Sequence, residues 1–223
     1  MTKILILMTN RDHLDNGEKN GTFALELTHA VHEFVEAGYD YELASIKGGA
    51  VPIYGEDFDP DDEVNKKLLS DEKVVNEIQN TRLIEDVNFE DYAAIYYPGG
   101  FGLLWDLAID ETVGKRTGKF LEDGGVVGAV CHGPAGFLPV TYADGSSMLD
   151  GLTVTGFTRE EEIDYGTIDK IPFLLEESLN RKAARFEKVQ PWGENVITQG
   201  KVISGQNPQS AGAVGRAIVK ALG

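Results

Sequence analysis

Residues 124–136 read GGVVGAVCHGPAG, an apolar run that ends in Cys131 and His132 with glycines on both sides. Small residues around a reactive side chain are typical of a nucleophile elbow, a tight turn that presents the side chain at the end of a strand. The residues after the cysteine, with a proline among them, favour the start of a helix. The stretch therefore predicts a strand over 126–130, a sharp turn at Cys131 and a helix directly after it.

The rest of the chain alternates between short β-rich apolar runs and segments whose apolar residues recur at helical spacing. Further strands are expected at residues 4–7, 41–45, 93–97 and 152–155, with a late hairpin formed by 196–198 and 201–204. Helices are expected at residues 22–37, 113–122, 173–182 and 208–222. This alternation predicts an α/β fold with a mostly parallel sheet covered by helices on both faces. Such sheets bind ligands beyond the carboxyl ends of their strands.

Residues 48–91 interrupt this rhythm. The segment is acidic, with the sequence DFDPDD at 57–62, and it joins two expected strands by a long excursion. Connections of this length are often binding elements. We expect a single domain over residues 1–223, with 48–91 inserted as a lid-like loop with one or two helices over the strand ends.

Composition restricts the function classes. The chain has 37 acidic and 20 basic residues and a formal net charge of −17, which disfavours binding to nucleic acid and to anionic membrane surfaces. No apolar run approaches the roughly 18 residues of a membrane span. A single cysteine allows no internal disulfide and no cysteine-rich zinc site, and it fits a reducing compartment. We expect a cytoplasmic protein that has no metal or cofactor.

Cys131 is predicted to be a catalytic or oxidation-sensitive thiolate. The partial positive charge at a helix N-terminus would lower the pKa of its thiol, and free N–H groups there could bind an oxyanion. A free cysteine is more often an ordinary buried residue, but the polar His132 directly after it favours function. The Pro-Gly-Gly turn at 98–100 should lie beside the elbow in a parallel sheet, which makes Gly99 and Gly100 candidate oxyanion or substrate contacts.

Few residues could serve Cys131 as an acid–base partner. The four histidines are His13, His29, His32 and His132, so the late histidine that amidotransferases pair with their thiolate is missing. His132 itself, an N-terminal residue or a carboxylate must serve instead.

Glu26 is the best carboxylate among these candidates. It lies on the first expected helix among apolar neighbours, although most helix glutamates are simply solvated. It also forms a Glu-x-x-His pair with His29, but a di-iron site needs two such pairs from a helical bundle, so no metal site is predicted.

Taken together, the elbow, the Pro-Gly-Gly turn and Glu26 resemble the DJ-1/PfpI superfamily, which is related to the class I glutamine amidotransferases. The resemblance is strongest to the branch that holds the heat-shock protein thirty-one chaperones and the cofactor-independent glyoxalase III enzymes. It covers nearly the whole chain. The matching blocks are residues 21–26, 44–49, 97–107, 129–134, 155–162, 171–176 and 198–210.

The resemblance implies a flavodoxin-like three-layer sandwich that forms a homodimer. It implies Cys131 as the nucleophile, His132 as its partner and Glu26 as the acid beside the thiol. Glu162 would orient His132, a role that the residues alone could not single out within the run 160–162. Oxyanion contacts would fall to the backbones of Gly100 and His132. Relatives often carry histidine where this chain has Phe101, which affects the expected substrate preference.

The leading functional hypothesis is a glutathione-independent glyoxalase that converts methylglyoxal or a related 2-oxoaldehyde to a 2-hydroxy acid, lactate in the case of methylglyoxal. Deglycation of glyoxal-modified amines would use the same thiol chemistry. The first alternative is a stress-response holding chaperone, which needs an exposed apolar patch but not Cys131. The second is a cysteine peptidase or amidase, which the missing late histidine disfavours.

Overall fold

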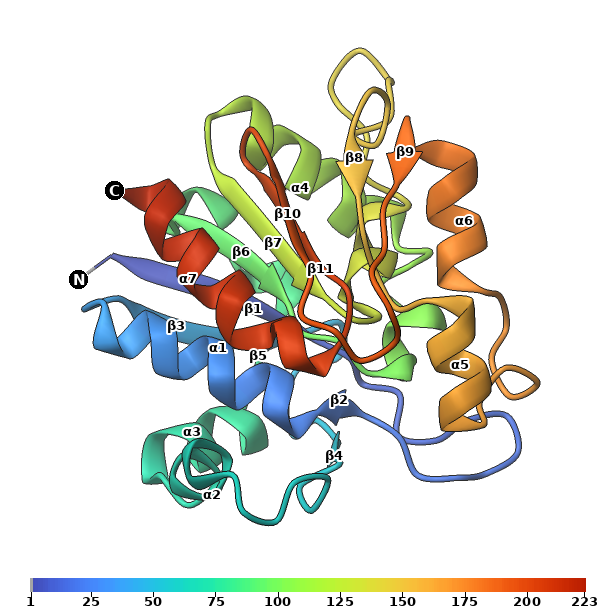
Figure 1. Ribbon diagram of the computed structural model, residues 1–223. Helices are drawn as coiled ribbons and strands as arrows, with labels where there is room; N and C mark the ends of the chain where they lie inside the picture. The colour runs from blue at the N-terminus through green and yellow to red at the C-terminus, as the bar shows by residue number, and fades with distance from the viewer. Residues whose placement is uncertain (1) are drawn as a thin grey trace.

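A seven-stranded sheet organises the computed structural model, which describes residues 2–223 (Figure 1). The strand order is β10-β11-β7-β6-β1-β3-β5, and only the β10–β11 pairing is antiparallel. The strands of this sheet are β1 (Lys3–Met8), β3 (Asp40–Ser45), β5 (Arg82–Leu83), β6 (Ala94–Tyr97), β7 (Val126–Val130), β10 (Val196–Gln199) and β11 (Val202–Gly205). The expected α/β fold with a mostly parallel sheet is confirmed.

The sheet separates two hydrophobic cores, as the alternation of side chains along a buried strand requires. In β1, Ile4 and Ile6 face the core beneath the helices α1 (Ala24–Glu36) and α7 (Ala211–Leu222). Leu5 and Leu7 face the opposite core, which receives Phe120 of α4 (Glu111–Glu122). Figure 1 shows α1 and α7 side by side across one face of the sheet. Helices on both faces give the three-layer sandwich.

The remaining helices and short strands surround this framework. The α-helices are α2 (Glu63–Leu69), α3 (Glu72–Gln79), α5 (Arg159–Tyr165) and α6 (Leu175–Lys182). The 3-10 helices are η1 (Ile84–Asp86), η2 (Phe89–Asp91), η3 (Phe101–Leu104), η4 (Gly133–Phe137) and η5 (Pro208–Ser210). Two small parallel pairs lie outside the main sheet: β2 (Thr22–Phe23) with β4 (Ile53–Tyr54), and β8 (Thr153–Val154) with β9 (Arg185–Phe186). Among residues 2–223, no helix combines the length and the apolar character that crossing a membrane requires.

Three local expectations from the sequence differ from the structure. The residues after Cys131 form a five-residue 3-10 helix, η4, and not an α-helix. The strand expected at 152–155 shortens to β8 and pairs with β9, outside the main sheet. Helix α5 was not expected because its three consecutive glutamates show no apolar stripe. It begins at Thr158, whose side chain and that of Glu161 form a capping box.

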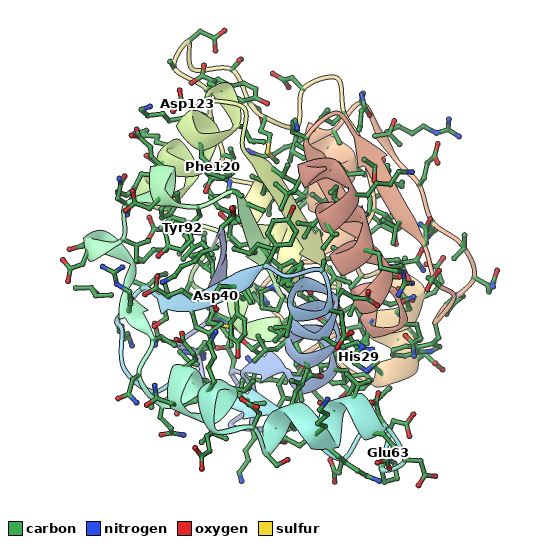
Figure 2. The ribbon with its side chains drawn as sticks, turned by 90° about the vertical axis from the view of Figure 1, so that its left-hand side faces the viewer. His29, Asp40, Glu63, Tyr92, Phe120 and Asp123 are labelled. Carbon is green, nitrogen blue, oxygen red and sulfur yellow. The ribbon has the colours of Figure 1, made fainter. Side chains whose placement is uncertain are left out.

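The acidic segment 48–91 contains β4, α2, α3 and β5, and so the one or two helices expected in it are present. Figure 2 shows α2, labelled at Glu63, below α1, labelled at His29. The two helices are joined by His29 Nε2 and Asp62 Oδ2, which lie 2.6 Å apart, and Asp62 also caps the N-terminus of α2. Because β4 pairs with β2 at the start of α1, the segment is anchored beside the carboxyl ends of the strands.

Candidate active site

Cys131 lies at the carboxyl end of β7 with a positive φ of 58°, a left-handed conformation that costs about 1–2 kcal/mol for a residue with a side chain. Two backbone hydrogen bonds hold it there: its N–H donates to Gly205 O (3.0 Å), and its carbonyl accepts from Phe157 N (2.9 Å). A side chain on Gly133 would collide with Tyr97 O, so the turn also needs that glycine. The expected elbow geometry is therefore present.

The imidazole of His132 connects the thiol to a buried carboxylate. Its Nδ1 lies 3.4 Å from Cys131 Sγ, and its Nε2 lies 2.7 Å from Glu162 Oε1. The Thr167 hydroxyl donates to the other carboxylate oxygen of Glu162, which fixes that side chain as an acceptor. Hence Nε2 carries the ring proton and Nδ1 presents its lone pair to the thiol. This arrangement suits His132 as the base for Cys131.

The ring of His132 is also held by packing. The centroids of Phe101 and Phe157 lie 4.4 Å and 4.7 Å from the imidazole centroid. His132 and Glu162 are each only 1% exposed. Phe101 thus packs against the imidazole that faces the thiol.

Glu26 contributes a second buried carboxyl group to the site. The residue is fully buried in the first turn of α1, and its Oε2 accepts a hydrogen bond of 2.5 Å from the Gly99 N–H. Its Oε1 has no hydrogen-bond partner among the described residues. Burial raises the pKa of Glu26 to about 8, against the lowering effects of the neighbouring Cys131 thiol and the Gly99 N–H. Near neutral pH the group is largely protonated.

Burial raises the pKa of the Cys131 thiol well above its usual range, and a five-residue 3-10 helix supplies little opposing dipole. The Glu26 carboxyl adds to this rise in the pKa only when it is ionised. The buried setting of the thiol thus opposes the lowering of its pKa that a helix N-terminus would give. His132 Nδ1 is placed to accept the thiol proton when the reactive thiolate forms.

Of the two glycines of the Pro-Gly-Gly turn, only Gly100 has a backbone N–H free to bind a substrate oxygen. The Gly99 N–H is occupied by Glu26 Oε2, so the prediction of Gly99 as an oxyanion contact is corrected: this glycine holds the carboxyl. The N–H groups of Gly100 and His132 have no acceptor among the described residues. Gly100 has a φ of 117°, which only glycine adopts readily.

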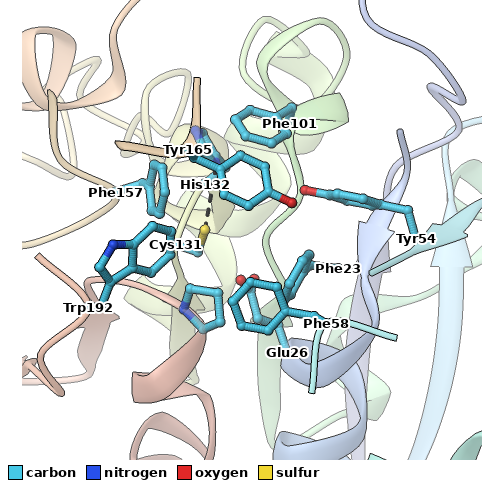
Figure 3. A pocket seen from close by; sticks show the side chains of 11 residues that line it. Phe23, Glu26, Tyr54, Phe58, Phe101, Cys131, His132, Phe157, Tyr165 and Trp192 are labelled. Carbon is cyan, nitrogen blue, oxygen red and sulfur yellow. Dashed lines mark hydrogen bonds between the residues drawn. The ribbon is translucent and has the colours of Figure 1, made fainter. Parts of the chain in front are cut away.

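These groups open into a narrow pocket with mostly aromatic walls (Figure 3). The walls consist of Phe23, Tyr54, Phe58, Phe101, Phe157, Tyr165, Trp192 and Pro208. Cys131 itself is only 5% exposed. The pocket is narrow and mostly apolar, and so it offers few polar contacts to a molecule that reaches the sulfur.

Most of these wall residues could not be selected from the sequence. Tyr54 and Phe58 come from the acidic insert, and Trp192 comes from a loop before β10. Glu161 holds that loop by accepting hydrogen bonds from Trp192 N (2.9 Å) and Asn207 Nδ2 (2.8 Å). A signal that could have pointed to Trp192 is its aromatic side chain at a position with positive φ, but φ is visible only in the structure.

Gly99→Ala is expected to lower the free energy of unfolding by about 1–3 kcal/mol, as overpacking of a tight core does. A Cβ at this position would lie 2.3 Å from Glu26 Oε2 and 2.8 Å from Cys131 Cβ. Chemical denaturation measures the change. Gly212→Ala in α7 is the matched control, because its Cβ meets only the flexible ends of the Arg216 and Glu33 side chains and alanine favours helix. Equal stabilities of Gly99→Ala and wild type would contradict the close contact.

Known proteins resemble this chain over nearly its whole length. The family model described as DJ-1/PfpI family matches residues 19–221. Glyoxalase 3 of Candida albicans is 30% identical, over 100% of this chain and 99% of its own length. Protein/nucleic acid deglycase HchA of Escherichia coli is 27% identical, over 96% of this chain and 78% of its own. The crystal structure of Rapid Encystment Protein 24 kDa from Francisella tularensis superposes with a TM-score of 0.94 at 32% identity, covering both chains completely.

Proposed function

The chain belongs to the DJ-1/PfpI family, and we propose that it is a glutathione-independent glyoxalase that converts methylglyoxal or related 2-oxoaldehydes to 2-hydroxy acids. The observation that carries the proposal is the convergence of a base and a protonated carboxyl on one thiol. His132 Nδ1 and Glu26 both neighbour Cys131 at the base of a narrow pocket. A narrow apolar pocket above the thiol favours a small aldehyde as substrate, and no other reactant is needed besides water.

The first step forms a hemithioacetal. His132 accepts the thiol proton, and the sulfur of Cys131 forms a bond to the aldehyde carbon of the substrate. The π electrons of the carbonyl move to its oxygen, which the N–H groups of Gly100 and His132 can stabilise. Glu26, protonated near neutral pH, then gives its proton to this oxygen and becomes a carboxylate.

The second step moves a hydrogen from the first carbon, which was the aldehyde carbon, to the second carbon, which was the ketone carbon. The Glu26 carboxylate removes the proton from the carbon bonded to sulfur, which gives an enediolate, and returns it to the neighbouring carbon. The hydroxyl proton passes from the oxygen on the first carbon to the oxygen on the second carbon. The first carbon is thereby oxidised to a thioester and the second reduced to an alcohol, so the redox change is internal to the substrate.

Hydrolysis completes the cycle. Water attacks the thioester carbon and gives a proton to Glu26, and the departing sulfur of Cys131 recovers its proton from His132. The product is lactate when the substrate is methylglyoxal. All three groups return to their starting protonation states. Glu162 keeps the transiently charged His132 paired at 2.7 Å throughout.

Deglycation is a second candidate activity, favoured by the similarity to a protein named as a deglycase. The same thiol would attack the carbon that an aldehyde has attached to an amine. The bulky walls of the pocket and the 5% exposure of Cys131 favour free aldehydes over glycated protein side chains.

Lactate production from methylglyoxal without glutathione tests the proposed function. We expect the wild-type protein to form lactate in buffer containing no thiol other than its own, with a no-enzyme sample subtracted. Suppression of client aggregation by the wild type and by Cys131→Ala alike, with no lactate from either, would instead support a holding chaperone.

We also propose a homodimer in the cytoplasm, with residues 48–91 serving as a lid. The family resemblance supports the dimer, and the need to keep Cys131 reduced supports the reducing compartment. Tyr54 and Phe58, both from the inserted segment, line the pocket and support the lid. Light scattering of the purified protein measures the mass in solution, and a monomeric mass would refute the dimer.

A further inference from the structure

The proposed substrates carry two neighbouring oxygen atoms, and the site described so far accounts for only one. The aldehyde oxygen meets the N–H groups of Gly100 and His132 once the sulfur has added. The second oxygen, that of the ketone, enters a pocket with mostly aromatic walls. The side-chain donors of these walls are the hydroxyls of Tyr54 and Tyr165 and the indole N–H of Trp192, which already donates to Asp164. A carbonyl oxygen that leaves water without a new partner weakens binding. A donor for this oxygen would therefore favour 2-oxoaldehydes over simple aldehydes.

Tyr54 is positioned to be this donor. Its backbone is fixed by the parallel pairing of β4 with β2, and its ring packs edge-on against Phe23 with the centroids 5.2 Å apart. The ring of Phe101 lies 6.3 Å away on another side. Figure 3 shows the Tyr54 hydroxyl pointing into the pocket that Cys131 also lines.

The Tyr54 hydroxyl has no hydrogen-bond partner among residues 2–223. Other buried tyrosines do: Tyr96 donates to Glu26 O at 2.8 Å, and Tyr97 pairs with the Thr117 hydroxyl at 2.8 Å. The hydroxyl of Tyr165 also points into the pocket, but that residue is 39% exposed, whereas Tyr54 is half-buried and therefore the more enclosed of the two. A partly buried donor facing a reactive thiol, with no protein partner, suits a substrate oxygen.

We propose that the Tyr54 hydroxyl donates a hydrogen bond to the substrate oxygen that Cys131 does not attack, and so selects 2-oxoaldehydes over simple aldehydes; this rests on the proposed glyoxalase function. The same bond strengthens as the enediolate develops negative charge on that oxygen. Burial raises the pKa of Tyr54 well above its usual range, so the hydroxyl keeps its proton. Tyr54 thus supplies a polar contact that Phe101 cannot.

Tyr54→Phe tests this assignment because it removes one oxygen and keeps the ring. The probes are methylglyoxal, followed as lactate, and propanal, a competitive inhibitor of similar size that lacks the ketone oxygen. We expect kcat/KM for methylglyoxal to fall about 10- to 100-fold, as expected for loss of one hydrogen bond to a buried or charged oxygen. The inhibition constant of propanal should change less than about twofold, because propanal has no second oxygen to lose a bond.

Tyr142→Phe, outside the pocket, is the matched control and should leave both values unchanged. Turnover of methylglyoxal by Tyr54→Phe within about twofold of wild type would overturn the assignment. An equal loss of propanal binding would also overturn it, since that result indicates a general disturbance of the pocket. If the wild type makes no lactate, the proposed function fails, and this inference with it. Lactate from the wild type and from Tyr54→Phe at equal rates would refute this inference alone.

Discussion

Cys131→Ala is expected to lower lactate formation from methylglyoxal by about a thousandfold or more, because every intermediate of the proposed reaction is covalently bound to the sulfur. Without the thiol, neither the hemithioacetal nor the thioester can form. His132 and Glu26 would remain in place but would have no nucleophile to serve. Steady-state kinetics with a lactate assay measures the loss.

The fold of this variant should survive, since Cys131 contributes only a small side chain to its core. Circular dichroism and denaturant unfolding are the controls for structure. Retention of more than about a tenth of wild-type turnover by Cys131→Ala would mean that the reaction proceeds without a covalent intermediate.

Glu26→Gln is expected to reduce turnover by about a hundredfold or more while it stabilises the fold at alkaline pH. Glutamine has nearly the same shape but cannot carry the proton from one substrate carbon to the next. The wild-type kcat/KM should fall as the pH rises above about 8, because the reaction begins with Glu26 protonated. Measured pH profiles of kcat/KM should show this decline in the wild type, and the residual activity of the variant should lack it.

The effect on stability has a definite sign. The pKa of Glu26 rises from 4.5 in its unperturbed state to about 8 in the folded protein, so folding takes up a proton between these values. The stability that this linkage provides is fully present below pH 4.5 and is lost as the pH rises to about 8. The Glu26→Gln variant should therefore exceed the wild type by about 2–5 kcal/mol at pH 9 and by much less at pH 5. A constant difference between the two proteins at both pH values would contradict a buried, protonated Glu26.

Much of the fold was predictable because strands buried on both faces leave a clear signal. The run VVGAV at 126–130 and the run at 4–7 both became central strands, and the hairpin about Gly200 formed as expected. Helix α5 was not predictable from the sequence. It is stabilised by a capping box and by contacts of its glutamates, and so its sequence shows no hydrophobic residues at helical spacing.

The candidate site residues also include some that the sequence predicts and some that only the structure shows. Cys131, His132, Glu26 and Glu162 lie together, although Glu162 was placed by family resemblance and not by its own chemistry. The protonation state of the thiol was not predictable, because it depends on how completely Glu26 and Cys131 are buried side by side. Tyr54 was not predictable either, since it reaches the pocket through the β2–β4 pairing, which joins residues about thirty positions apart.

Mass spectrometry of the Cys131-containing peptide, after acid quenching during turnover of methylglyoxal, tests the proposed covalent intermediate on Cys131. We expect a fraction of this peptide to carry the added mass of one methylglyoxal. This fraction should appear before lactate accumulates and disappear when the substrate is exhausted. Lactate accumulating at the wild-type rate while Cys131 stays unmodified at every time point would contradict the covalent intermediate.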